Sequence, residues 1–588
     1  MGLGGYYGHF QGHLLSATAM LYNNTGDKTV LGLAQQTIEA FKECTTAWEK
    51  KYGKAGRGFL FPYDLIVFDI LEQKHPPLQK ALYSVPYYTI HKLMAGLLDQ
   101  YELTGNRDAL ALAEHMADWV RGRVDDAFSR GGQDLWQRIL NTEWGGMNEA
   151  LFNLYRLTGN KAYLDTGRAF NHWVWSAPLA AGVDDLAHNH ANTHIPEVIG
   201  NAVGYELTGN NTDFAITREF FAAVTTNHSW ATGGSNDGEY WQLARKLGDN
   251  LDAHTEESCT QYNTLKVARH LFGWSGDSSL VDFYERALWN GIIGNQLIEA
   301  AGTSFIYMLP LGGGGLQKQW GASNYGFVCC WGSLTEHFSK LTDSIFFESP
   351  DHETLYVAQF IAAKLRWAAH GVTITQETTF PVDPARTTKL TVSGGSGNEN
   401  FTLALRVPVW AVVGPNAVTV NGAAVSPKEV VPGQWLRLSR AWAHGDVVEA
   451  SFPLGVWASP VLDDRPEWSE VVAFMYGPLV LAGLTDSDRF VPLGGRARDP
   501  STFLARNSTE ALSFEAKAAD GARMHLVPLF EVAREAYSVY FHTDEASPLP
   551  QPRSRMLAGA GATIVPRGTA HARMLHASPA RSIPVPVT

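Results

Sequence analysis

Apolar residues in the first half of the chain recur at the three- and four-residue spacing of amphipathic helices. One such stretch contains Leu93, Leu97, Leu98 and Tyr101, and it ends at the phrase Thr-Gly-Asn over residues 104–106. Glycine favours the left-handed conformation that ends a helix, and Asn or Asp favours the position that starts one. The phrase therefore predicts the turn of a helical hairpin.

The same phrase recurs along the first half of the chain, as LYNNTGD ending at Asp27, YELTGN at Asn106, LYRLTGN at Asn160, YELTGN at Asn210 and LFGWSGD at Asp277. Repeated hairpins stack as an open solenoid or close into an (α/α)6 toroid. The connections over residues 121–146, 171–195 and 228–256 are long, polar and aromatic, whereas solenoid repeats are tight and uniform. We expect a toroid whose long loops form a substrate cleft at one end.

The pattern changes after about residue 346 to short segments rich in β-branched residues, such as GVTITQETTF, NFTLALRVPVW and WLRLSRAW. Turn residues separate them, which is typical of a β-sandwich. The sequence thus predicts an α+β multidomain protein with an (α/α)6 barrel over residues 1–346, a β-sandwich over 347–457 and a second β-rich domain over 458–588. A poorly ordered tail is expected from about Leu557.

Composition and charge exclude several kinds of partner. Of the 588 residues, 45% are hydrophobic and 18% are charged, which is ordinary for a globular protein. The formal net charge is −13 and no run of Lys or Arg stands out, so we expect no nucleic acid and no anionic membrane as partner. No apolar stretch approaches the roughly 20 residues that span a bilayer.

The sequence leaves the compartment open. The first residues show no basic region followed by an apolar one, so the chain is expected to start inside a domain, with any signal peptide upstream. Sequons at Asn23, Asn210, Asn227, Asn400 and Asn507 would accept glycans in a secreted protein, but such triplets also arise by chance. They favour an extracellular location only slightly.

Three of the four cysteines lie in chemically suggestive sequence. Cys259 follows Glu257 in HTEESC, and Cys329 and Cys330 are adjacent in FVCCWGS. Adjacent cysteines form a disulfide with difficulty, whereas three thiolates and one carboxylate supply the four ligands of a tetrahedral zinc ion. Three unlinked buried cysteines are the alternative. Cys44, in the helical segment FKECTTAW, is expected to be an ordinary buried thiol.

Both halves of this cysteine set are expected at helix N-termini. Ser333-Leu-Thr-Glu336 has the pattern of a capping box, which starts a helix just after the adjacent cysteines. Cys259 lies near the start of a helix that continues through Leu265 and Leu271. The positive end of a helix dipole and a metal ion both favour thiolates. A zinc ion with four protein ligands is usually structural, and the spacing does not separate that role from a catalytic one.

Several segments together resemble glycoside hydrolase family 127, the β-L-arabinofuranosidases, and its sister family 146; they are GHFQGHLLSATAMLY, VPYYTIHKLMAGLLDQY, WGGMNEALFNLYRLTGN, THIPEVIGNAVGYELTGN, ATGGSNDGEYW, TEESCTQYN, FVCCWGS, LRVPVW and YGPLVLAG. The likeness extends from residue 1 to about residue 485. It implies an (α/α)6 barrel followed by β-sandwich domains, with a zinc ion in the active site. Relatives usually carry a further segment before the GHF-x-GH motif, so the family pattern implies that the first barrel elements are missing here.

The resemblance also implies residue roles. Cys329 would be the nucleophile, Glu257, Cys259 and Cys330 would bind zinc together with it, and Glu239 would be the acid/base. In retaining hydrolysis Glu239 protonates the leaving oxygen while Cys329 attacks the anomeric carbon, and Glu239 then activates the water that releases the sugar. A rival assignment makes Glu257 the nucleophile, although a carboxylate on zinc is a weaker candidate.

Further residues complete the expected substrate pocket. His91 in YYTIHK and His194 in NTHIPE match substrate-contacting positions of the family, and Glu149 in GGMNEA is a weaker match. Trp241 and Trp331 flank the catalytic motifs and are expected to stack on sugar, with simple packing as the alternative.

The leading hypothesis is a zinc-dependent retaining exo-glycosidase that releases terminal L-arabinofuranose from an arabinose-containing oligosaccharide, glycan or glycoprotein. One alternative is a different sugar enzyme on the same toroid, such as an epimerase or an unsaturated-uronide hydrolase. The other is a non-catalytic carbohydrate-binding protein with a structural zinc ion. The β domains offer a surface for oligomer formation.

Overall fold

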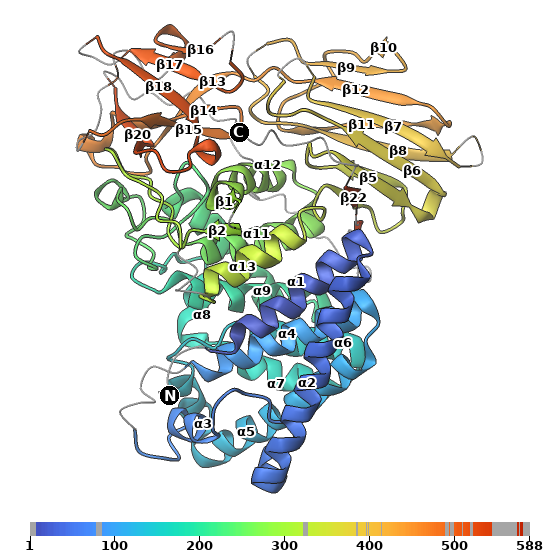
Figure 1. The fold of residues 1–588 in the computed structure, drawn as a ribbon, viewed down its shortest axis with the longest axis vertical. Helices are drawn as coiled ribbons and strands as arrows, with labels where there is room; N and C mark the ends of the chain where they lie inside the picture. The colour runs from blue at the N-terminus through green and yellow to red at the C-terminus, as the bar shows by residue number, and fades with distance from the viewer. Residues whose placement is uncertain are drawn as a thin grey trace.

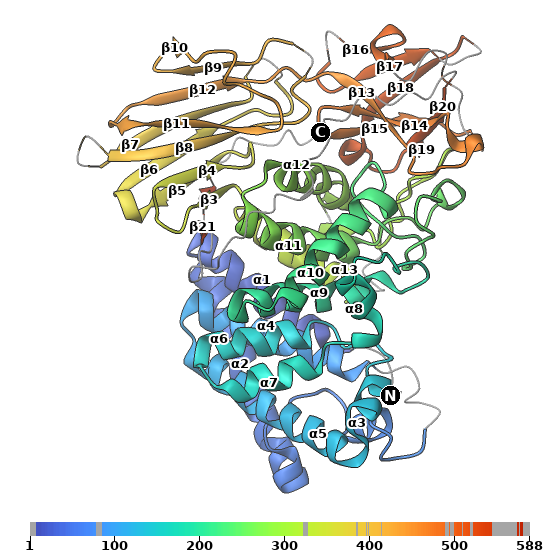
Figure 2. The same ribbon diagram turned by 180° about the vertical axis from the view of Figure 1, so that it is seen from behind.

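The structure is a computed structural model that describes residues 7–77, 85–300, 302–321, 327–383, 386–395, 397, 399–412, 414–487, 493, 499–507, 510–517, 521–543, 573–575 and 577–579. The tail expected from about Leu557 lies outside the described residues, apart from the last two ranges. Helices of the N-terminal half gather at one end of the molecule, and two β regions lie side by side at the other (Figures 1 and 2). The predicted α+β multidomain class is confirmed.

Six helices form a closed inner ring: α1 (His9–Thr25), α4 (Pro86–Thr104), α6 (Met147–Thr158), α9 (Ala191–Thr208), α11 (Ser258–Ser275) and α13 (Cys329–Ser339). Each packs against the next in this order, and α13 packs back against α1, which closes the ring. Outside it lie α2 (Lys28–Tyr52), α5 (Arg107–Ile139), α7 (Lys161–Ala169), α10 (Asn211–Ala223) and α12 (Ser278–Ala287). The ring is the (α/α)6 type of barrel that the repeats predict. None of its helices within the described residues is long and apolar enough to cross a membrane.

The repeated phrase forms the helical hairpins as predicted. Inner helices end at glycines with positive φ, namely Gly26 (71°), Gly105 (76°), Gly159 (72°), Gly209 (67°) and Gly276 (65°). The next residue caps the following outer helix, because its side chain accepts a hydrogen bond from a backbone N–H in the first turn; these caps are Asp27, Asn106, Asn160, Asn210 and Asp277. Each turn therefore provides hydrogen-bond partners for backbone groups at the end of one helix and at the start of the next.

Two expectations for the helical region are wrong. Residues 121–139 belong to α5 and not to a loop, and the helix passes a kink at Gly132, whose φ is 61°. Cys44 is exposed and not buried. It lies on the outer helix α2, where the described buried residues are only Ala34 and Ile38, so most of this helix faces solvent. Two shorter helices, α3 (Ile66–Leu71) and α8 (Trp173–Ala180), lie in the connections.

The first β region is a sandwich of two sheets around one apolar core. A seven-stranded sheet has the order β10-β9-β12-β7-β6-β5-β22, and a five-stranded sheet has the order β11-β8-β4-β3-β21. The strands are β3 (Phe346–Glu348), β4 (Thr354–Val357), β5 (Ala363–Trp367), β6 (Val372–Glu377), β7 (Thr388–Gly394), β8 (Glu399–Val407), β9 (Ala417–Val420), β10 (Ala423–Ala424), β11 (Gln434–Trp442), β12 (Val447–Ser451), β21 (Arg573–Leu575) and β22 (Ala577–Pro579). Alternating burial along β5 and β6 places every second side chain in this core.

The second β region is one eight-stranded sheet that covers loops of the barrel. Its strands are β13 (Val456–Pro460), β14 (Val471–Tyr476), β15 (Leu479–Leu484), β16 (Leu504–Arg506), β17 (Phe514–Lys517), β18 (Arg523–Pro528), β19 (Tyr537–Ser538) and β20 (Tyr540–His542). On one face Met475 shares a core with Trp230 and Ile306 of the barrel connections, and on the other Phe474 packs with Phe514. A separate hairpin consists of β1 (Gln296–Glu299) and β2 (Gly302–Phe305).

Buried charges join the barrel to both β regions. Arg406 of β8 is fully buried and donates to Glu285 of α12 at 2.6 Å and to Asp282 at 2.5 Å. Lys318 donates to the carbonyl oxygens of Gly294 and Leu529 at 2.7 and 2.8 Å. Buried charges require such partners, so these contacts fix the β regions against the barrel.

Candidate active site

The four residues of the predicted metal site come together at one end of the ring. One ligand atom from each of Glu257, Cys259, Cys329 and Cys330 lies within 4.8 Å of all the others. Glu257 is the N-cap of α11 and Cys259 lies in its first turn, while Cys329 and Cys330 are the first residues of α13. Because α11 and α13 are neighbours in the ring, two helix N-termini converge on one point.

The predicted helix start at Ser333 is wrong, because α13 begins at Cys329 with Val328 as N-cap. Ser333 and Glu336 lie inside the helix and have partners from other helices instead of capping one. Ser333 Oγ donates to Cys259 Sγ at 3.3 Å, and Glu336 accepts from the Tyr262 hydroxyl at 2.5 Å. The two cysteines therefore lie in the first helical turn, where the free N–H groups favour negative charge.

The cluster is buried and acidic. Cys330 is 0% exposed, and Cys259 and Glu257 are each 1% exposed. Burial raises the pKa of Glu257, Cys259 and Cys330 well above their usual values. Hydrogen bonds from Cys259 and Cys330 hold the pKa of Cys329 well below that of a free thiol. Four such groups ionise together only beside a cation, so the donor set fits a metal ion.

Glu239 stands at the tip of a tight turn. Asp237 and Tyr240 exchange two backbone hydrogen bonds of 3.0 Å, and the two residues between them, Gly238 and Glu239, have φ of 54° and 72°. Positive φ at both positions is the type I′ arrangement, in which a side chain other than glycine or asparagine is strained. Such strain is typical of a functional residue.

Tyr307 connects Glu239 to the cysteine cluster. Its hydroxyl donates to Glu239 Oε1 at 2.5 Å and lies 3.4 Å from Cys329 Sγ. The backbone carbonyl of Tyr307 accepts from Ser258 N–H at 3.0 Å, which fixes the residue beside the start of α11. The sequence offers no signal for this residue, since IYMLP reads as an ordinary apolar segment.

His190 approaches Glu239 from the start of α9. Its Nε2 lies 3.4 Å from Glu239 Oε2, and its Nδ1 accepts from the backbone N–H of Thr193 at 3.2 Å as the helix cap. The acceptor role of Nδ1 places the proton on Nε2, which faces the carboxylate. The hydrogen bond with His190, opposed by burial, holds the pKa of Glu239 below its usual value.

The predicted His194 lies one turn deeper than His190. It is 9% exposed, its ring packs 4.3 Å from that of Trp175, and its Nδ1 is 3.1 Å from the carbonyl oxygen of His190. Burial lowers the pKa of His194 to about 3, so it is neutral. Sequence reasoning chose His194 and missed His190, which is the histidine that faces Glu239.

His91 and Glu149 occupy neighbouring positions of the ring. His91 is buried against two glycines, where an added Cβ at Gly145 or Gly146 would come within 2.5 or 2.8 Å of a ring nitrogen. Glu149 in α6 pairs with Lys266 of α11 at 2.9 Å. This pair ties two inner helices together.

The two predicted sugar-stacking tryptophans differ in exposure. Trp241 is fully buried between Trp175 and Phe220, and its indole N–H faces Ser235 Oγ at 3.2 Å. It leaves no face for a sugar, so the stacking expectation for Trp241 is wrong and its simple packing alternative holds. Trp331 is half-buried directly after the cysteines.

Glu143 is a further carboxylate that the sequence does not single out. It precedes Trp144 in the loop before α6 and is half-buried. Burial raises its pKa to about 7, and the charges of Cys329 and Glu239 add to the rise. It therefore belongs to the same group of charges as Glu239.

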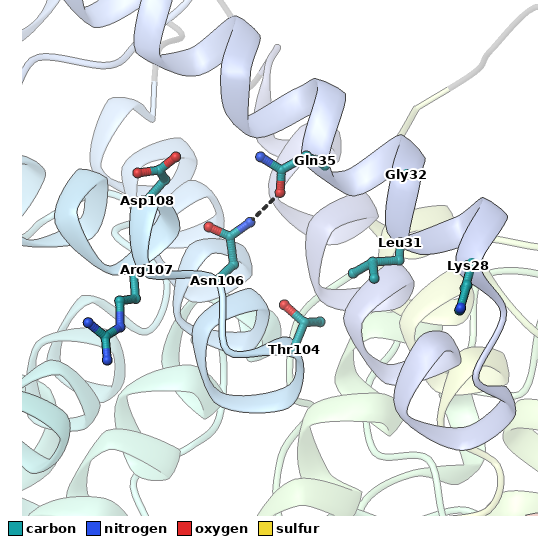
Figure 3. Close-up of a pocket in the computed structure, with 8 residues that line it drawn as sticks. All are labelled: Lys28, Leu31, Gly32, Gln35, Thr104, Asn106, Arg107 and Asp108. Carbon is teal, nitrogen blue, oxygen red and sulfur yellow. Dashed lines mark hydrogen bonds between the residues drawn. The ribbon is translucent and has the colours of Figure 1, made fainter.

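A surface groove lies away from this site. Figure 3 shows it between α2 and the turn from α4 to α5, where Asn106 donates to Gln35 at 2.8 Å. Its volume is about 630 Å³, and Lys28, Leu31, Thr104 and Arg107 contribute to its wall. It lies at the C-terminal ends of α1 and α4, whereas the cysteine cluster lies at the N-terminal ends of α11 and α13.

Two family models match the chain. One, described as β-L-arabinofuranosidase, GH127 catalytic domain, matches residues 4–343, and the other, described as β-L-arabinofuranosidase, GH127 middle domain, matches residues 354–454. Comparison with curated protein sequences finds no match.

Solved structures show the same fold. The crystal structure of a GH127 β-L-arabinofuranosidase from Geobacillus stearothermophilus T6 has a TM-score of 0.66 at 19% identity, over 90% of this chain and 89% of that one. A GH127 β-arabinofuranosidase gives 0.69 at 20% identity, over 91% and 88%. A structure described as a glycoside hydrolase gives 0.68 at 16% identity, over 91% and 92%.

Proposed function

Because the chain belongs to glycoside hydrolase family 127, we propose that this hydrolase releases terminal L-arabinofuranose from arabinose-containing glycans with retention of configuration, with Cys329 as nucleophile and Glu239 as acid/base. Family membership favours hydrolysis over the epimerase and the non-catalytic alternatives. The resemblance seen in the sequence is thereby confirmed.

The observation that carries the mechanism is the position of the Tyr307 hydroxyl between the two reacting groups. Glu239 Oε1 and Cys329 Sγ lie 2.5 and 3.4 Å from it, so they cannot be farther apart than these two distances together. Inverting glycosidases need about 6.5–9.5 Å between their two groups to admit a water, whereas retaining ones keep them about 5–5.5 Å apart. The spacing supports direct attack by Cys329.

Each residue has its own role in the two steps of the reaction. The low pKa of Glu239 makes it a carboxylate in the free protein, so it has to take up a proton when the substrate binds. Cys329 Sγ then bonds to the anomeric carbon as the bond to the leaving oxygen breaks, and Glu239 passes that proton to the leaving oxygen. Glu239, now a carboxylate, takes a proton from the water that releases the sugar from sulfur. His190 and Tyr307 orient the carboxyl group through both of its oxygens.

We also propose that Glu257, Cys259, Cys329 and Cys330 hold Zn²⁺. Three sulfurs and one oxygen in a buried group match zinc, whereas magnesium and calcium prefer oxygen ligands alone. When bound, the ion would supply the positive charge that keeps the thiols deprotonated. Glu257 is a weaker nucleophile than Cys329, because it is buried and lies 3.5 Å from Cys330 Sγ within the ligand set.

Substrate contacts are proposed for His91, His194, Glu149 and Trp331. Glu143 joins this set because its carboxyl group interacts electrostatically with Glu239 and Cys329. Trp241 does not, since it is enclosed by other side chains.

The test is hydrolysis of aryl furanosides and pyranosides of both anomeric configurations, with zinc measured in the same preparation. We expect turnover of L-arabinofuranosides alone, and a covalent glycosyl adduct on Cys329 detectable by mass spectrometry in slowly hydrolysing variants. C329S should lose turnover and keep the fold, whereas C44S, which changes an exposed cysteine of α2, should retain turnover. Full activity of C329S would refute the assignment.

A further inference from the structure

Two exposed aromatic side chains adjoin the proposed catalytic residues. Tyr240 directly follows Glu239 and is 46% exposed, and Phe327 precedes Cys329 by two positions and is 65% exposed. Aromatic rings exposed to this degree do not belong to a hydrophobic core, and their flat faces suit the C–H face of a sugar. The mechanism described above uses neither ring.

The ring of Tyr240 is held beside the acid/base. The backbone of Tyr240 closes the tight turn through its two hydrogen bonds with Asp237, so the side chain does not have to hold the loop. Its ring meets that of His190 at 84° with centroids 5.3 Å apart, and His190 Nε2 faces the Glu239 carboxylate at 3.4 Å. Ring, imidazole and carboxylate thus form one continuous row.

Every member of this row is partly exposed, and the cysteine beside it is not. Cys330 is 0% exposed, whereas the side chains of Glu239 and His190 are 35% and 26% exposed and Tyr240 is 46% exposed. The row therefore leads from the buried cluster to solvent. A substrate unit that extends outward from Glu239 along this row meets the ring of Tyr240.

The stereochemistry of displacement assigns the two aromatic residues to different sides. Attack by Cys329 and departure of the leaving group occur on opposite faces of the anomeric carbon, and the acid lies on the side of the leaving oxygen. Tyr240 is the neighbour of the acid, whereas Phe327 is the neighbour of the nucleophile. The leaving unit is consequently next to Tyr240.

We propose that Tyr240 forms the binding platform for the leaving sugar unit, to which the arabinofuranosyl group is bonded, by stacking on that unit's apolar face. The inference rests on the proposed function and adds a leaving-group subsite to it. This subsite favours a glycan over an arabinofuranoside of a small alcohol, because methanol has no ring to stack.

The experiment compares two substrates with the same arabinofuranosyl group, an arabinofuranosyl-arabinose disaccharide and methyl arabinofuranoside, through the ratio of their kcat/KM values. We expect Y240A to lower this ratio about tenfold, which corresponds to the loss of one aromatic contact. Y240F keeps the ring and should keep the ratio. L243A, which truncates another exposed apolar side chain of the same loop, is the matched control and should also leave the ratio unchanged.

Each other outcome has one meaning. An unchanged ratio in Y240A overturns the inference. If the two kcat/KM values fall by the same factor, the ring only supports Glu239. If the wild-type protein hydrolyses neither substrate, the proposed function fails, and this result is distinct because it does not involve Tyr240. Thermal unfolding of Y240A checks that the variant is folded.

Discussion

His13 Nδ1 of α1 and the Glu336 carboxylate of α13 form a buried hydrogen bond of 2.6 Å between the first and last helices of the ring. Glu336 also accepts from Tyr262 of α11, so one carboxylate joins three inner helices beneath the cysteine cluster. Gly332 permits this closeness, because a Cβ there would come within 2.3 Å of the His13 ring. The closure of the ring and the position of the thiols depend on the same residues.

Removal of this carboxylate should destabilise the barrel. We expect E336A to lower the free energy of unfolding by about 3–5 kcal/mol, since it leaves His13 and Tyr262 buried without their partner. Calorimetry measures the change. The exposed pair of Glu102 with Arg156 provides the control, because E102A should cost less than about 1 kcal/mol. Similar effects of the two variants would contradict the role given to Glu336.

The strained turn at Glu239 should make the variants E239A and E239G differ in stability. E239A and E239G both remove the carboxylate and should both abolish turnover. Glycine accepts the φ of 72° without strain, so E239G should be more stable than E239A by about 1 kcal/mol. Chemical denaturation of the two variants tests this, and equal midpoints would show that the turn stores no strain.

Removal of metal should weaken the fold as well as the activity. Glu257 and the three clustered cysteines are buried acidic groups that need a cation to ionise together. We expect a strong chelator to lower the melting temperature by several degrees and C330S to bind less zinc per chain. C44S should bind as much zinc as the wild-type protein. A chelator that changes neither stability nor activity would argue against the metal.

Glu197 should make stability fall as pH rises. It is fully buried in α9, and burial raises its pKa to about 8, although a hydrogen bond from the His172 N–H acts against this rise. The folded state therefore keeps a proton that the unfolded chain, with a pKa near 4.5, releases. Its contribution is complete below pH 4.5 and is lost as pH rises through 8.

The variant E197Q isolates this effect, because glutamine does not ionise. We expect the wild-type protein to lose up to about 4 kcal/mol more than E197Q between pH 5 and pH 8. Melting temperatures across this range provide the measurement. Parallel curves for the two proteins would mean that Glu197 is ionised in the folded state.

The parts of the fold that local chemistry determines could be predicted from the sequence. The Thr-Gly-Asn phrase determines both ends of a helical turn within a few residues, and the structure has a left-handed glycine followed by a capping side chain at each repeat. Glu257, Cys259, Cys329 and Cys330 were also identified, because their residue types suit only a few chemical roles.

The remaining features depend on tertiary contacts. Ser333 and Glu336 have the spacing of a capping box, but their partners Cys259 and Tyr262 lie on another helix, and those contacts override the local pattern. Tyr307 and His190 acquire their roles only by approaching Glu239 in space. Cys44 was misjudged because helical periodicity does not distinguish an outer helix from an inner one.

The last described strands have a consequence for how the chain reaches its native state. β21 pairs with β3 and β22 pairs with β5, so residues 573–575 and 577–579 cover one edge of each sheet of the sandwich. During synthesis on the ribosome both edges stay open until these residues emerge, more than a hundred residues after the sandwich itself. Unpaired strands recruit other chains, so nascent molecules that lack this segment are the ones most prone to aggregate.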